Sequence, residues 1–189
     1  MRSLRSVLII AFAVLAGSQQ SSPQDAWSAQ KAVPDSCPMN PRPARPFIPP
    51  ADYRLFDYLA GEDAPKDFFW IGTEKLWTEV AEKMVWEWIP HSPGHEQDLT
   101  AKISWYREGY SWSREPVPKI KVTGKRIDGP APPLMLPQGP ATHIILDDYH
   151  GSILTGVYVP APGCWKITGD YEGDKLSFNV WVVPVKPER

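Results

Sequence analysis

Histidine and aspartate side chains that could hold a metal ion gather in two short polar segments of the sequence. His91 and His95 have the four-residue spacing of a helical metal pair. A proline and a glycine between them interrupt any helix, so the two side chains are not expected to share a face. Asp147, Asp148 and His150 form a second polar turn, but their spacing matches no EF-hand loop. The sequence therefore predicts no bound metal or other cofactor, with these five residues as the candidates if a metal is bound.

Serine and cysteine, the usual nucleophiles, lack a catalytic context in this chain. Ser152 follows Gly151 without the flanking residues of a nucleophile elbow. Cys164 precedes Trp165 inside an expected strand, where a disulfide suits it better than a reactive thiolate. We therefore predict no catalytic residues. The alternative is a metal-dependent or hydrolytic enzyme that uses the histidines and aspartates of the two polar segments.

Aromatic residues are the one compositional excess, with nine tryptophans and seven tyrosines. Flat rings on an exposed surface can stack on sugars, so a carbohydrate-binding face is one interpretation. Tyr110 and Trp112 in an expected loop, and Trp181 in the last expected strand, are the candidate ligand-binding residues. For Trp181 we favour the alternative that it lies beneath a proline-rich N-terminal segment. The strand pattern assigns four other tryptophans to the core: Trp86, Trp88, Trp105 and Trp165.

Residues 1–18 have the pattern of a signal peptide. Arg2 and Arg5 precede an apolar run at residues 7–15, and small residues follow it at a suitable distance for cleavage. The apolar run is too short to span a bilayer as a permanent helix, and no later segment is long and apolar enough to do so. We predict a secreted or periplasmic protein with no stable membrane insertion after cleavage.

The charge of the chain argues against nucleic acid as a partner. Removal of residues 1–18 takes away two arginines and no acidic residue, which moves the formal net charge from −2 to −4. Proteins that bind nucleic acid normally carry a basic excess to neutralise phosphates. The one basic stripe alternates with apolar residues, as expected for the solvated face of a strand. It consists of Lys119, Lys121, Lys125 and Arg126.

The two cysteines, Cys37 and Cys164, permit a single intramolecular pairing in a chain bound for an oxidising compartment. We predict a disulfide between them, the alternative being two buried free thiols. The link would close a loop of roughly 130 residues, which the chain-entropy model values at about 5 kcal/mol.

Residues 19–50 have the composition of a linker or arm, with seven prolines between positions 34 and 50. Such a run forms neither a helix nor a central strand and favours extended, polyproline-like chain. Because Cys37 lies within it, we expect residues 37–50 to be ordered along the surface of the domain that follows. The alternation of the partner strand agrees, since it puts Cys164 on the face opposite Trp165.

The remaining chain, residues 51–189, is predicted to form one domain. Residues 51–66 fit a helical turn or two, and from residue 67 onward apolar and polar residues alternate as in half-buried strands. Eight or nine strands are expected, in the segments 68–72, 75–80, 84–88, 99–107, 119–127, 142–146, 152–159, 164–171 and 175–183. The last three are expected to pair consecutively as a meander. The pattern favours an all-β, antiparallel immunoglobulin-like β-sandwich with an extended proline-rich N-terminal arm, and a small closed barrel is the alternative.

Three longer loops, at residues 89–98, 108–118 and 128–141, are where we expect any local function. The last contains five prolines and is predicted to wrap the domain as a stiff ribbon.

Several motifs resemble those of a group of uncharacterised exported bacterial proteins. They are a Ser-Cys-Pro element at residues 36–38, WYREGY at 105–110, VTGKRIDGPAPPL at 122–134 and GVYVPAPGCWKITGDYEGDKLSFNVWV at 156–182. The resemblance covers most of residues 37–183. Its final part is similar to the last two strands of bacterial immunoglobulin-like domains, so it implies a fold and assigns no functional residue.

These observations favour an exported, non-catalytic protein with a binding or structural role at the cell envelope. The partners that fit are a glycan, recognised by loop aromatics, or an envelope protein. An accessory domain of an envelope complex is predicted to expose an apolar patch.

Overall fold

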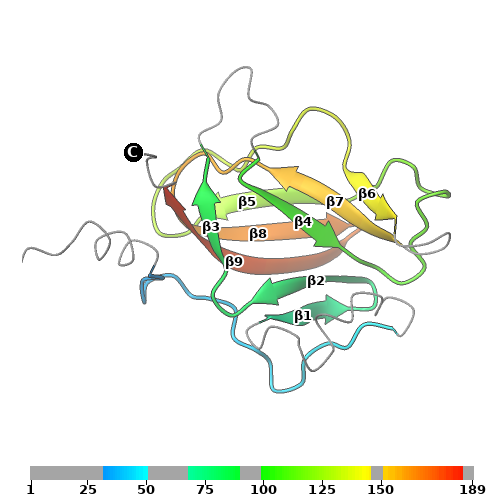
Figure 1. The fold of residues 1–189 in the computed structure, drawn as a ribbon, viewed down its shortest axis with the longest axis horizontal. Coiled ribbons are helices and arrows are strands. Elements are labelled where there is room, and N and C mark those ends of the chain that lie inside the picture. The colour runs from blue at the N-terminus through cyan, green and yellow to red at the C-terminus, as the bar shows by residue number, and fades with distance from the viewer. Residues whose placement is uncertain (1–31, 51–67, 90–98, 146–150, 185–189) are drawn as a thin grey trace, which may run out of the picture.

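The computed structural model describes residues 32–50, 68–89, 99–145 and 151–184, and within them every regular element is a strand (Figure 1). The predicted signal peptide at residues 1–18 and the predicted helical turns at 51–66 lie outside the described residues. The strands are β1 (Phe68–Thr73), β2 (Leu76–Ala81), β3 (Val85–Trp88), β4 (Ala101–Trp105), β5 (Lys121–Arg126), β6 (Thr142–Ile145), β7 (Gly151–Val157), β8 (Gly163–Tyr171) and β9 (Asp174–Pro184).

Two sheets pack face to face and enclose the hydrophobic core (Figure 1). One sheet has four strands in the order β3-β9-β8-β5, and the other has three in the order β4-β7-β6. Side chains of β4 and β7 join those of β8 and β9 in one buried cluster, so the two layers form a sandwich. The predicted all-β sandwich is confirmed, whereas its assignment to the immunoglobulin-like class stays a prediction.

One strand pair departs from the predicted antiparallel arrangement. β3 runs parallel to β9, with Val85 opposite Trp181 and Trp88 opposite Pro184. Parallel neighbours cannot be joined by a tight turn, and most of the domain lies between these two strands in the sequence. The sheet is therefore mixed, with β3 as an edge strand.

The last three strands do not form the predicted meander. β7 pairs with β4 and β6 in the three-stranded sheet, and β8 pairs with β9 in the other. Pro160 and Pro162 lie between β7 and β8, where they offer no N–H to a ladder, and the chain crosses there from one sheet to the other. The β8–β9 hairpin itself is confirmed. Its turn residues Glu172 and Gly173 both have positive φ, 53° and 103°, as a two-residue hairpin turn of this hand requires.

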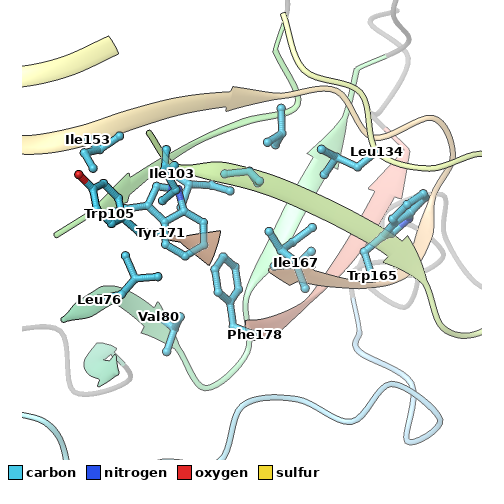
Figure 2. Close-up of a cluster of buried hydrophobic side chains, with 14 of the residues drawn as sticks. Leu76, Val80, Ile103, Trp105, Leu134, Ile153, Trp165, Ile167, Tyr171 and Phe178 are labelled. Carbon is cyan, nitrogen blue, oxygen red and sulfur yellow. The ribbon is translucent and has the colours of Figure 1, made fainter. Parts of the chain in front are cut away.

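Aromatic side chains fill the middle of the sandwich (Figure 2). Trp105 of β4 and Trp165 of β8 are fully buried, as predicted. Their indole N–H groups donate to Thr155 Oγ1 and to the Ala161 carbonyl, each at 2.9 Å, so no polar atom of either ring is stranded in the core. Phe178 of β9 lies against Trp105 with ring centroids 5.9 Å apart, which links the two sheets.

The tryptophans of β3 lie at the rim of this core. Trp86 and Trp88 are half-buried and pack against the enclosed residues. The indole of Trp88 donates to the Val159 carbonyl at 2.8 Å, which ties β3 to the segment that follows β7. They are less enclosed than predicted because β3 is an edge strand, with one side open.

A second aromatic cluster joins the β1–β2 hairpin to the rest of the molecule. Trp77 is fully buried and stacks on Tyr106, with centroids 6.0 Å apart, and the two residues also exchange backbone hydrogen bonds of 2.9 Å. Trp70 meets Tyr106 edge to face, and Phe47 of the N-terminal segment lies 5.4 Å from Trp77. The hairpin is thus attached through aromatic packing at the end of β4.

The N-terminal segment, residues 32–50, is tied to the outer face of the four-stranded sheet. The predicted disulfide between Cys37 and Cys164 is present, with Cα atoms 5.5 Å apart. The side chain of Asn40 makes the two hydrogen bonds that the backbone of a neighbouring strand would make. It donates to the Asn179 carbonyl at 2.8 Å and accepts from the Asn179 N–H at 2.7 Å. The Asn179 side chain in turn donates to the Pro38 carbonyl. The backbone N–H and C=O of Asn179 and the carbonyl of Pro38 thus have hydrogen-bond partners although the N-terminal segment forms no regular ladder with β9.

The disulfide indicates an oxidising environment of the extracellular type. Among the residues that the structure describes, there is no helix that could cross a bilayer.

Reduction of the Cys37–Cys164 disulfide is expected to lower the free energy of unfolding by about 2 to 5 kcal/mol, because the link restrains a long loop of the unfolded chain. The two cysteines are 127 positions apart. Urea denaturation with and without reductant measures the difference. A Cys37→Ala, Cys164→Ala double variant should unfold at the same urea concentration in both buffers. Identical curves for the oxidised and reduced wild-type protein, or two titratable thiols, would contradict the prediction.

Candidate functional site

The predicted metal candidates lie outside the described residues. They are His91, His95, Asp147, Asp148 and His150. In residues 32–50, 68–89, 99–145 and 151–184 there is no group of three or more histidine, cysteine, aspartate or glutamate side chains that could hold a metal ion.

Tyr110 is a core residue and not the exposed anchor that the sequence predicts. Its side chain is 3% exposed, because the loop at residues 108–118 folds back onto the end of β8. Glu115 fastens this loop: it accepts from the Tyr171 hydroxyl and from the Lys119 N–H, the latter at 2.7 Å. Burial raises the pKa of Tyr110 and of Tyr171 to about 12, and the negative charge of Glu115 acts in the same direction. Both phenols therefore stay protonated in the physiological range.

Trp112 and Trp181 are each half-buried and lie at different ends of the sheet. Trp112 packs against the core from the loop that is fastened at Tyr171. Trp181 lies opposite Cys164, at the other end of β8 and on the face that carries the disulfide-linked segment. Tyr110, Trp112 and Trp181 are therefore not brought together in one binding surface.

A groove opens beside β7 at the point where its ladder with β6 stops. The last pair of that ladder joins Thr142 to Leu154, and the next backbone pair joins Met135 to Tyr158. Seven positions separate Met135 from Thr142, but four separate Leu154 from Tyr158. The segment between Met135 and Thr142 therefore has three more residues than the stretch of β7 that it faces, so the two cannot pair continuously. The resulting cavity has a volume of about 540 Å³.

Gly156 turns its backbone N–H and C=O toward this groove. The Val157 carbonyl accepts from the Thr100 N–H at 2.9 Å on the β4 side, and successive residues of a strand point their backbone groups to opposite edges. Gly156 therefore faces the same edge as Tyr158, whose N–H and C=O bond to Met135. Pro137 and Pro140, which lie in the segment that faces Gly156, have no N–H to offer to the Gly156 carbonyl. The floor of the groove thus carries a donor and an acceptor at strand spacing.

The walls of the groove are apolar and partly open to solvent. Leu136 is 46% exposed and Val117 is 59% exposed, on opposite loops. Among the described residues that line the groove, Lys102 has the single charged side chain and there is no aromatic ring. The remaining lining residues are Leu99, Pro118, Ile120, Val122, Pro137, Gln138, Gly139, Pro140, Ala141, Thr142, Leu154, Thr155 and Gly156. Such a cleft matches a ligand with apolar side chains and a hydrogen-bonding backbone.

A second cavity, of about 340 Å³, holds a carboxyl group with an unusual environment. Glu79 of β2 is half-buried in its wall, and burial raises the pKa of Glu79 to about 7 although a hydrogen bond with Tyr106 opposes the shift. A carboxyl with such a pKa can act as a general acid or base. The described residues that line this cavity include no second carboxyl, histidine or cysteine, and so these residues assemble no acid–base pair.

The groove and Glu79 were both missed by the sequence reasoning. Apolar residues in loops, such as Val117 and Leu136, carry no chemical signal of their own. The signal that could have indicated the groove is the proline content of residues 128–141, because a segment with few N–H groups cannot extend a ladder. Glu79 stands out in sequence as the one charged residue of the strand Leu76–Ala81.

No protein-family model matches this chain, and neither a curated protein nor a solved structure shows significant similarity to it. Of the two cavities described above, the groove beside β7 is the larger, with a volume of about 540 Å³ against about 340 Å³.

Glu79 is expected to make the protein less stable as the pH rises from about 4.5 to 7. In the folded state Glu79 keeps its proton up to a pKa of about 7, whereas the unfolded chain releases it near the ordinary carboxyl pKa of 4.5. Stability is therefore highest below pH 4.5 and declines until pH 7, a change on the order of 3 kcal/mol.

Urea denaturation between pH 4 and 8 tests this dependence. Glu79→Gln should flatten the profile between pH 4.5 and 7, while Glu82→Gln, an exposed residue one position beyond the same strand, should leave it as in the wild type. Parallel profiles for the wild type and Glu79→Gln would show that Glu79 does not titrate as described.

Proposed function

We propose that this protein is an exported, non-catalytic binding protein of the cell envelope, whose groove beside β7 takes an extended apolar segment of a partner protein. The observation that carries the proposal is the backbone of Gly156, which offers a donor and an acceptor at the floor of an apolar cleft. An added strand would complete the ladder between the Leu154 and Tyr158 pairs, as in other cases of strand addition to a sheet edge.

The walls favour a peptide over a sugar. Sites for neutral sugars present aromatic faces and several polar side chains, whereas the described residues that line the groove are mostly apolar and include no ring. Alternate side chains of an extended peptide would point toward Leu136 on one side and toward Ile120 on the other. The exposed apolar surface at Val117 and Leu136 is the kind of patch that an accessory domain of an envelope complex would carry.

Export to the periplasm or the cell exterior is part of the proposal. It is supported by the disulfide between Cys37 and Cys164 and by the signal-peptide pattern at residues 1–18. A partner segment in the same compartment would reach the groove without crossing a membrane.

Binding of fluorescent eight-residue peptides that alternate valine with threonine tests the groove, with fluorescence anisotropy as the readout. We expect Leu136→Asp to weaken binding by about tenfold or more, because it places a charge where a buried apolar contact contributes roughly 1.5 kcal/mol or more. The matched control is Ile127→Asp, since Ile127 is a similarly exposed apolar residue that does not line the groove. Control binding should stay within twofold of the wild type.

A second measurement identifies the backbone contact. The amide resonance of Gly156 should shift when the alternating peptide binds, and a peptide of eight prolines should cause no shift because it has no N–H to complete the ladder in any register. Equal weakening by Leu136→Asp and Ile127→Asp, or an unmoved Gly156 amide at saturating peptide, would overturn the proposal. If a fatty acid binds and no peptide does, the proposed partner segment is wrong and the groove takes a small apolar ligand.

A further inference from the structure

The outer face of the four-stranded sheet carries a regular array of lysine and hydroxyl side chains. We call the nine residues of this array the lysine face. They come from β5, β8 and β9 and form three cross-strand rows: Lys121, Asp170 and Lys175; Thr123, Thr168 and Ser177; and Lys125, Lys166 and Asn179. All four lysines of the array are exposed.

Strand register, which sequence alone does not reveal, assembles this array. The basic stripe of the sequence divides between two faces: Lys121 and Lys125 point outward, whereas Arg126 turns away and forms an ion pair with Asp128 at 2.6 Å. β8 adds Lys166 directly opposite Lys125, and β9 adds Lys175. Four lysines and one aspartate give the lysine face a local charge of +3 in a chain whose formal net charge is −2.

The pair of Lys125 and Lys166 is the feature that points to a ligand. Residues directly opposite on neighbouring strands have Cβ atoms about 5 Å apart, and like charges in that position repel each other and destabilise the sheet. Asp170 lies within 3.5 Å of Lys175, at the other end of the lysine face, two rows away from this pair. An anion held between Lys125 and Lys166 would remove the repulsion.

We propose that the lysine face binds an acidic polysaccharide that lies across β5, β8 and β9. The row of hydroxyls between the two lysine rows fits the choice of a sugar, since Thr168 and Ser177 already share a hydrogen bond of 2.7 Å and can exchange bonds with sugar hydroxyls. The two lysine rows are four residues apart along the strands, or about 13 Å, a separation that successive acidic groups of a polymer can span.

Other polyanions fit this surface less well. The lysine face includes no aromatic ring on which a nucleic-acid base could stack, and none of its nine residues is an apolar side chain that could enter a membrane. On the β9 side it is bounded by the segment that Asn40 pairs with Asn179, and along β5 the Leu134 N–H donates to the Gly124 carbonyl at 3.1 Å. All four lysines of the lysine face are exposed, so a polymer lying across the three strands can reach them.

Polygalacturonate, a linear polymer of uronic acid, is the probe that tests the proposal on the full chain. Affinity electrophoresis at low ionic strength should show retardation of the wild-type protein by polygalacturonate and none by neutral dextran. Lys125→Gln, Lys166→Gln should weaken the interaction by about tenfold, because two charge contacts are lost. The matched control Lys75→Gln, Lys83→Gln removes the same charge elsewhere and should stay within twofold of the wild type. Retardation should also decline as salt is raised.

A thermal melt separates loss of binding from loss of folding. Without polymer, Lys125→Gln, Lys166→Gln should melt no lower than the wild type, because the repulsion between the two lysines is removed. With polymer, the wild type should gain more in melting temperature than this variant does. Equal retardation of the two double variants, or none of the wild type, would overturn the proposal. Equal binding of anionic lipid vesicles or single-stranded DNA, with the same sensitivity to Lys125 and Lys166, would overturn the assignment to a polysaccharide.

Discussion

The alternation of side chains along β8 is the constraint on which the rest of this structure depends. Successive residues of a strand point to opposite faces, so Trp165 and Ile167 enter the core while Cys164 and Lys166 point outward. A one-residue slip in register would exchange the two sets and put a charge into the core in place of a tryptophan. The core, the disulfide and the lysine face are therefore all fixed by one register, that of β8 between β5 and β9.

Proline determines where the regular pairing ends. Between β7 and β8 it separates strands that are neighbours in sequence and sends them to different sheets. In the segment between Met135 and Thr142 it leaves the edge of β7 without a continuous partner and so creates the groove. In the N-terminal segment, where ladder formation is equally hindered, the side chain of Asn40 makes the hydrogen bonds that a strand backbone would otherwise make. One residue type thus shapes the topology, the candidate site and the attachment of the N-terminal segment.

Local sequence patterns predicted the strands, the buried tryptophans of β4 and β8 and the disulfide, because each follows from alternation or from the only pairing available. The partners of the strands were not predicted in the same way. The meander was wrong because pairing of β7 is decided by tertiary contacts with β4 and β6, which alternation does not encode. Tyr110 was misplaced because a loop residue becomes buried only when another element, here Glu115 bound to Tyr171, draws its loop inward. The groove exists because the Thr142–Leu154 pair and the Met135–Tyr158 pair are separated by different numbers of residues on the two segments. Lys166 lies opposite Lys125 because of the register between β5 and β8. Each feature depends on how two strands align, so neither could be predicted from one strand alone.

The parallel pairing of β3 with β9 has a consequence for the order in which the chain folds. β9 is the last strand in the sequence, yet it lies inside its sheet, between β3 and β8. Trp181 is paired with Val85, almost a hundred positions earlier, so this contact closes a very long loop. Contacts of such high sequence separation slow folding and form late. The four-stranded sheet cannot be completed until β9 is available, so β3 has no strand partner in this sheet until the last described strand pairs with it.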